Sequence, residues 1–88
     1  DARRIHLSAN PVRGTALSLT YADPPDRVTV YTLGGRHVRT LRPSEIGPLS
    51  GTWPLDNEAG SAVANGPYIL VAEFGDERVL LKVFVARP

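Results

Sequence analysis

The chain has 88 residues, with 10 basic and 9 acidic side chains, a net charge of +1, and no cysteine or methionine. Without cysteine it can form neither disulfides, thiolate zinc sites nor a thiol nucleophile. Its balanced charge differs from the strongly basic face typical of nucleic-acid binding. A composition of 42% hydrophobic and 22% charged residues is that of a folded protein, and the length fits one domain over residues 1–88.

The chain begins at Asp1 and contains neither a signal-peptide core nor an apolar run of membrane-spanning length. We therefore expect a mature fragment or an excised domain of a longer protein, without direct membrane insertion.

Alternating apolar residues predict short β-strands along most of the chain. The predicted strands are residues 17–21, 28–31, 36–41, a short run from 51 that holds Trp53, 69–74 and 79–85, with His6 in an N-terminal strand. Prolines interrupt the connecting segments and disfavour helices, except for a single turn at residues 44–46. The pattern predicts an all-β, Ig-like sandwich of about seven short, mainly antiparallel strands.

A two-residue turn at Gly75-Asp76 sets the register of the last hairpin. It pairs Leu70 with Leu81 on the core face. The opposite, outer face is less polar than a solvated strand surface should be. Its predicted members are Val71, Leu80, Lys82 and Phe84. Either a loop side chain covers these residues, or they form a protein-docking face.

The turn at Gly34-Gly35 closes a second hairpin. A three-residue loop with Gly35 in the left-handed conformation places Val30 opposite Val38, which we favour over a two-residue loop that places it opposite Arg39. The irregular residues 42–51 are predicted to cross between the sheets. Residues 56–65 are predicted to form a loop that turns at Gly60.

Neither catalysis nor a cofactor is expected. His6 and His37 are isolated, and no serine lies in a Gly-x-Ser-x-Gly elbow. His37 is interpreted as an exposed strand residue, with a pH-sensitive contact as the alternative. Residues 56–60 contain oxygen ligands suited to calcium, but their spacing is not that of an EF-hand, so an Asx-type turn is favoured.

Two further sets of charged residues have simple structural interpretations. Asp23 and Asp26 flank two prolines and are expected to begin and end a turn. Arg36, Arg39 and Arg42 recur every third residue and cannot share one strand face. They are expected to form a solvated edge, with an anion groove as the alternative.

The order of several short motifs resembles a known family. The motifs are Asn10-Pro11, residues 28–31, 33–36, Val38, Leu41, residues 51–53, Gly60, Val63, residues 66–68 and a last strand with Lys82. This pattern, over about residues 10–87, is similar to the C-terminal sorting domain of type IX-secreted proteins (the Por secretion tail). It is equally similar to the Ig-like domain of the flagellar hook-capping protein.

Within this pattern Gly35, Trp53, Gly66 and Tyr68 are structural anchors: a left-handed turn, a large apolar core residue, a strand start and an inward-facing ring. The chain departs from the family at Thr32, where Asp is usual. It departs again at Pro54-Leu55, where Asp-Gly is usual, which makes the local loop geometry uncertain.

The resemblance implies a non-enzymatic C-terminal sorting or cell-surface attachment domain of a secreted protein, located outside the cytoplasm. The alternative is a structural docking module, or subunit, of a larger extracytoplasmic assembly. In both cases the partner is a protein, either secretion machinery or a neighbouring subunit or domain. Catalytic, cofactor and metal residues are not expected.

Overall fold

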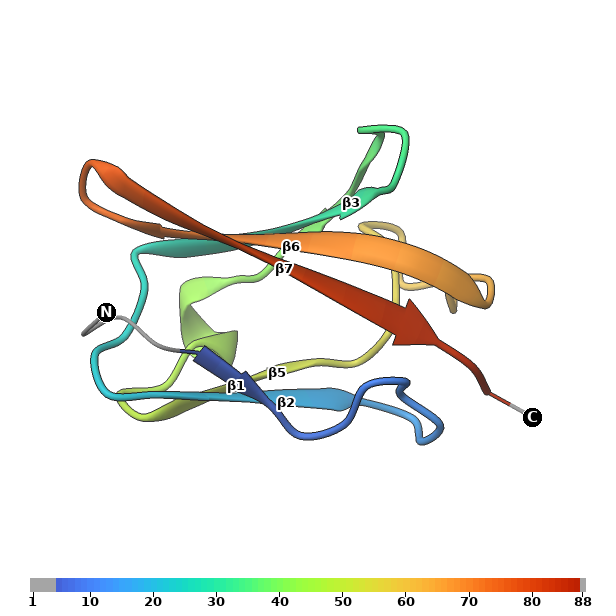
Figure 1. Cartoon of the computed structure of the whole chain (residues 1–88), viewed down its shortest axis with the longest axis horizontal. Coiled ribbons are helices and arrows are strands. Elements are labelled where there is room, and N and C mark those ends of the chain that lie inside the picture. The colour runs from blue at the N-terminus through green and yellow to red at the C-terminus, as the bar shows by residue number, and fades with distance from the viewer. Residues whose placement is uncertain (1–4, 88) are drawn as a thin grey trace.

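The computed structural model describes residues 5–87, and in this part of the chain seven β-strands form two facing sheets (Figure 1). The strands are β1 (Ile5–Leu7), β2 (Leu17–Tyr21), β3 (Arg27–Thr32), β4 (His37–Thr40), β5 (Ser50–Trp53), β6 (Gly66–Phe74) and β7 (Glu77–Val85). The smaller sheet has the order β1-β2-β5 and the larger the order β4-β3-β6-β7, and every neighbouring pair is antiparallel. The predicted all-β sandwich is confirmed.

The core lies between the two sheets and follows from the alternation of the strands. In β2 the three apolar residues are buried and the two polar ones exposed. In β6, Tyr68, Leu70, Ala72 and Phe74 are buried while the residues between them are only half-buried. Trp53 of β5 is fully buried. Each inward row removes apolar surface from water, which is the main force that holds the sheets together.

The register of the last hairpin is as predicted. Leu70 lies opposite Leu81, and Val71 lies opposite Leu80, throughout an unbroken β6–β7 ladder. Gly75 has a φ of +60°, which glycine adopts without a Cβ clash. Local turn chemistry therefore decided this pairing.

The predicted register of the β3–β4 hairpin is wrong, although its loop is correct. The amide of Thr32 donates to the Arg36 carbonyl, and Gly35 has a φ of +94°, so the loop has three residues. A β-bulge then shifts the ladder, and Val30 lies opposite Arg39 instead of Val38. The extra residue in β4 allows Val38 to pack against the core while Arg39 also becomes buried.

Three connections carry the chain between the sheets, and the first is formed by residues 22–26 between β2 and β3. Residues 41–49 cross as predicted and contain the 3₁₀ turn η1 (Pro43–Glu45), where a single helical turn was expected. Residues 54–65 cross back, with Gly60 at a φ of +85°. Within residues 5–87, no helix is long and apolar enough to span a membrane.

Candidate functional site

The predicted docking residues lie together on the outer face of the larger sheet. Cross-strand pairing places Val71 opposite Leu80, Ile69 opposite Lys82 and Pro67 opposite Phe84. Leu80 is 64% exposed and Phe84 is 49% exposed, so no described segment covers either side chain. We call Ile69, Val71, Leu80, Lys82 and Phe84 the β6–β7 outer face.

This face is broader than the sequence suggested. The β3–β6 register places Tyr31 opposite Ile69 and Thr29 opposite Val71, so the face continues onto β3. Thr29 is only 4% exposed, because its neighbours on both strands shield it. The hairpin turn was enough to predict which residues of β6 and β7 share this face. The contribution of β3 depends on a pairing between segments about forty residues apart. Exposed apolar surface of this kind is typical of protein contact sites.

The four family-like anchors have structural roles inside the sandwich. Trp53 is fully buried, and its Nε1 donates to the Asp56 carbonyl over 2.9 Å. Its ring meets that of Tyr68 edge-on, with centroids 5.7 Å apart. The Tyr68 hydroxyl donates to the Ala64 carbonyl over 2.6 Å, and burial raises the pKa of this phenol.

The two glycine anchors adopt left-handed φ values, +94° for Gly35 and +143° for Gly66. These conformations favour glycine because it lacks a Cβ atom. None of the four anchors belongs to the β6–β7 outer face.

The two departures from the family pattern are accommodated locally. The Thr32 hydroxyl accepts the amide of Arg36 over 3.0 Å and thus holds the hairpin loop. Leu55 has a φ of +56°, a conformation that costs a residue with a Cβ about 1–2 kcal/mol. The Leu55 side chain is fully buried, and burial of a leucine contributes about 1.5–3 kcal/mol. Packing thus offsets the backbone strain.

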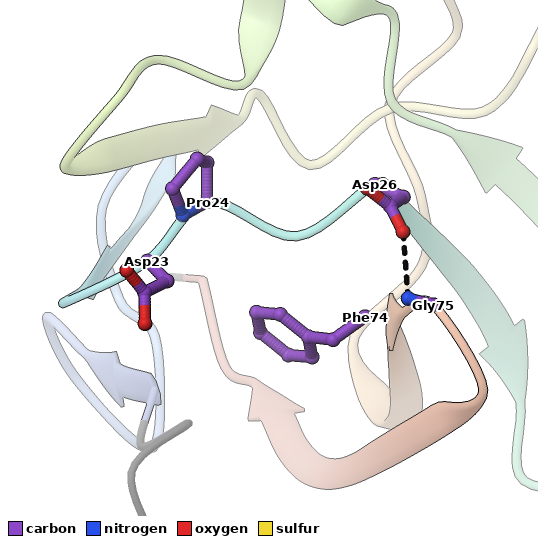
Figure 2. A pocket seen from close by; sticks show the side chains of 5 residues that line it. All are labelled: Asp23, Pro24, Asp26, Phe74 and Gly75. Atoms are coloured by element: carbon purple, nitrogen blue, oxygen red, sulfur yellow. Dashed lines mark hydrogen bonds between the residues drawn. The ribbon is translucent and has the colours of Figure 1, made fainter.

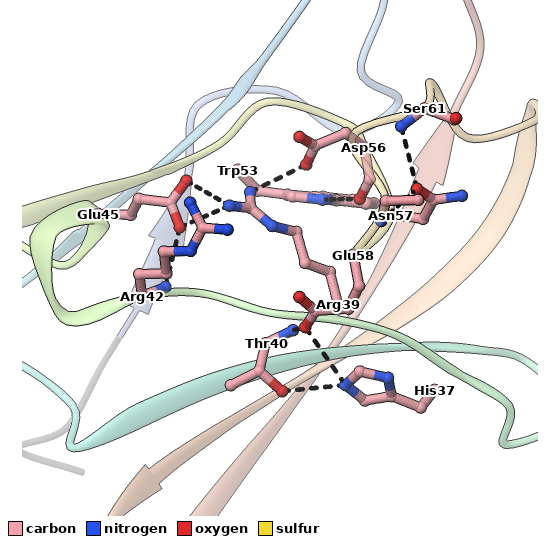
Figure 3. A network of polar contacts seen from close by, with 11 residues as sticks. His37, Arg39, Thr40, Arg42, Glu45, Trp53, Asp56, Asn57, Glu58 and Ser61 are labelled. Atoms are coloured by element: carbon pink, nitrogen blue, oxygen red, sulfur yellow. Dashed lines mark hydrogen bonds and ion pairs between the residues drawn. The ribbon is translucent and has the colours of Figure 1, made fainter.

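An ion cluster that the sequence did not predict surrounds Arg39 (Figure 3). Arg39 is only 5% exposed, which contradicts its expected place on a solvated edge; Arg36 and Arg42 are exposed as expected. The Arg39 guanidinium donates to both Glu45 carboxylate oxygens, at 2.6 and 2.7 Å, and to Asp56 Oδ1 at 2.9 Å. The bulged register brings Arg39 inward, and the two carboxylates satisfy its charge.

The cluster shifts two pKa values. Burial opposes the charged form of Arg39, but the hydrogen bond to Glu45 and the charges of Asp56, Glu45 and Glu58 raise its pKa above the usual value. Burial likewise acts to raise the pKa of Glu45. The Arg42 amide and the Arg39 guanidinium outweigh it and lower that pKa below the usual value. Both groups are therefore held in their charged forms.

Residues 56–60 form the predicted Asx turn. The Asn57 side-chain oxygen accepts the amides of Ala59 and Ser61, each over 3.0 Å. Glu58 Oε2 accepts the amide of Thr40 over 2.7 Å and lies 3.8 Å from the exposed His37 ring (Figure 3). These contacts attach the loop to the edge of β4. Across residues 5–87, no three His, Cys, Asp or Glu side chains gather as a metal site.

A hollow of about 230 Å³ lies beside the tip of the β6–β7 hairpin, lined by Asp23, Pro24, Asp26, Phe74 and Gly75 (Figure 2). Asp26 Oδ2 accepts the Gly75 amide over 2.6 Å. Its own amide donates to the Glu73 carbonyl over 2.7 Å. Asp26 therefore joins the β2–β3 connection to the tip of the β6–β7 hairpin, and these two bonds give it a structural role.

No family model and no curated protein matches the chain. Two solved structures share its fold over a small part of much longer chains. PorZ of Porphyromonas gingivalis, an essential surface component of the type IX secretion system, matches with a TM-score of 0.72 at 18% identity, over 94% of this chain and 11% of PorZ. PorU of the same bacterium, in its dimeric latent form, matches with a TM-score of 0.69 at 24% identity, over 98% of this chain and 9% of PorU.

The chain thus spans about a tenth of the length of each of these proteins. At such identities the likeness establishes a shared fold.

Proposed function

We propose that the chain is a non-enzymatic sorting or cell-surface attachment domain of a secreted protein and acts outside the cytoplasm through a protein partner. The observation that carries this proposal is the β6–β7 outer face, where Leu80 is 64% and Phe84 49% exposed. Burying two such side chains against a partner removes apolar surface from water, which favours association.

The structural neighbours support a role in secretion. The fold matches 94% of this chain to a portion of PorZ, a surface component of a type IX secretion system. The order of short motifs in the chain also resembles that of the type IX sorting domain, and two of the family-like anchors, Trp53 and Tyr68, pack against each other in the core. A domain of this size, carried within a longer chain, is suited to act as a sorting signal or as a cell-surface attachment domain.

The non-enzymatic part of the proposal is supported by the structural ion pairs and hydrogen bonds that these polar side chains form. Glu45 and Asp56 neutralise Arg39, Glu58 holds an amide of β4, and Asp26 holds the hairpin tip. These contacts position loops, and each group is engaged in a structural bond.

A structural docking module remains the second candidate. The same exposed face favours it, because a permanent subunit contact and a transient sorting contact both need apolar surface. The two candidates differ in where the domain acts: sorting requires the secretion machinery, whereas docking requires only the neighbouring subunit.

A fusion experiment tests the proposal and separates the candidates. The chain is placed at the C-terminus of a secreted fluorescent reporter in a bacterium with a type IX system and in a mutant without one. Sorting predicts surface fluorescence only in the competent strain, and loss of this signal when Leu80 and Phe84 are both changed to Asp. Leu49→Asp is the matched control, because Leu49 is exposed outside this face. Surface-negative cells that contain folded fusion would refute sorting; binding of the fusion to an envelope protein in both strains would favour docking.

A further inference from the structure

The outer edge of β7 is covered along its second half by residues 10–12. The amide of Val12 donates to the Phe84 carbonyl, and the amide of Ala86 donates to the Val12 carbonyl, each over 2.8 Å. The Asn10 side chain accepts the Phe84 amide and donates to the Lys82 carbonyl, each over 3.0 Å. Residues 10–12 thus act as a short additional strand that ends at Lys82.

Among residues 5–87, nothing covers Arg78 and Leu80 of the same edge in this way. The backbone groups of Lys82 and Phe84 point away from β6, and the β6–β7 ladder is regular, so those of Arg78 and Leu80 point the same way. Within residues 5–87, no other backbone group bonds the outward amides or carbonyls of Arg78 and Leu80. An extended segment could pair with this stretch, residues 78–82, as an added strand.

The other sheet edges are less suited to strand addition. The edge of β4 is held by Glu58, whose amide donates to the Val38 carbonyl and whose carboxylate accepts the Thr40 amide. The edge of β5 is held by the amide of Gly47, which donates to the Ser50 carbonyl. The strand β1 has only three residues. Residues 78–82, apart from the Lys82 carbonyl that Asn10 occupies, therefore offer the longest open edge in the described part of the chain.

Charge indicates which partner fits. Arg78 and Lys82 lie on the outer face on either side of Leu80, and all three side chains are exposed. In a symmetric pairing of two copies centred on Leu80, each Arg78 would lie opposite a Lys82, and like charges across strands are destabilising. Basic residues on an edge protect against such self-association. A second copy of this chain is thus disfavoured, and carboxylates opposite both cations are favoured.

We propose that the docking partner contributes an extended segment with acidic, apolar and acidic residues at alternate positions. This segment adds to the β7 edge at residues 78–82, with its apolar residue beside Leu80 and its carboxylates beside Arg78 and Lys82. The inference rests on the proposed action through a protein partner, and it specifies that partner and its mode of contact. The pattern reads the same in both directions, so it suits a parallel or an antiparallel strand.

The probe is a synthetic peptide with a central Glu-Thr-Leu-Thr-Glu, compared with the same peptide carrying Lys at both Glu positions. Amide NMR shifts on titration should be largest at residues 78–82. The acidic peptide should bind about tenfold tighter than the basic one, because two favourable cross-strand pairs replace two repulsive ones. This preference should shrink as the salt concentration rises.

Two perturbations separate strand addition from simple charge attraction. Methylating the peptide amides on the edge that faces β7 should abolish binding, whereas methylating those on the opposite edge should not. Changing Arg78 and Lys82 together to Glu should reverse the preference toward the basic peptide. Equal binding of both peptides, shifts centred elsewhere, or binding that survives methylation on either edge would overturn the proposal.

This result is distinguishable from failure of the proposed function. If surface attachment depends on Leu80 and Phe84 but the peptides do not bind the edge, the domain docks through its face without adding a strand. If neither the fusion nor the peptides respond, the docking function itself is wrong.

Discussion

Replacing Trp53 removes the largest side chain of the core and separates two of its contributions. Trp53 is fully buried, packs edge-on against Tyr68 and donates one hydrogen bond to Asp56. Trp53→Ala creates a cavity, and such changes cost about 3–5 kcal/mol. Trp53→Phe keeps a ring but leaves the Asp56 carbonyl without this donor, at a cost of about 1–3 kcal/mol.

Thermal unfolding followed by far-UV circular dichroism measures both changes. In a domain of this size each kcal/mol lowers Tm by about 4–8 °C. Trp53→Ala should therefore lower Tm by about 12–40 °C, and Trp53→Phe by about half as much or less. Leu49→Ala is the control: Leu49 is 66% exposed, and such a surface change should alter stability by about 0.5 kcal/mol or less. A cooperative Trp53→Ala transition within a few degrees of the wild type would refute the assigned core position.

Three further predictions concern the ion cluster, the turns and the β7 edge. The folded-state pKa of Glu45 is lowered. The ionised Glu45 carboxylate therefore stabilises the fold above about pH 4.3, and this stabilisation is lost as pH falls through the folded pKa. Urea unfolding at several pH values should show this loss of stability, and Glu45→Gln should make the loss smaller. Gly75→Ala should cost about 1 kcal/mol because its φ is +60°, whereas Gly14→Ala, with open space around its Cβ position, should not destabilise in the same melting assay. Asn10→Ala removes both side-chain bonds to β7 and should cost about 1–2 kcal/mol, with faster hydrogen exchange at Phe84; unchanged exchange would contradict this role.

The candidate docking face could be predicted in part from the sequence. The two-residue turn at Gly75-Asp76 set the register that places Val71, Leu80, Lys82 and Phe84 on one face, and this register is confirmed. Alternation within 17–21 and 69–74 identified the buried rows. These features are local: the side-chain period of a strand is two, and a tight turn fixes which residues face each other.

In the β3–β4 hairpin, local sequence was not sufficient to predict the strand register. The loop and the left-handed Gly35 followed from sequence, but the bulge that places Arg39 opposite Val30 did not. A regular ladder would be favoured by local pairing alone. The bulge is stabilised by Glu45 and Asp56, which reach Arg39 from two later loops and make burial of its charge acceptable.

By itself, the sequence determined the strand positions, the all-β class, the turns and the inward rows of β2 and β6, because each depends on spacing over a few residues. Only the tertiary structure decided which edges are covered and which charges are buried. Residues 10–12 reach β7 across some seventy positions of sequence, and Glu58 reaches β4 from another loop. Such contacts depend on where distant segments meet in space, so the open edge at residues 78–82 became visible only when its neighbours were in place.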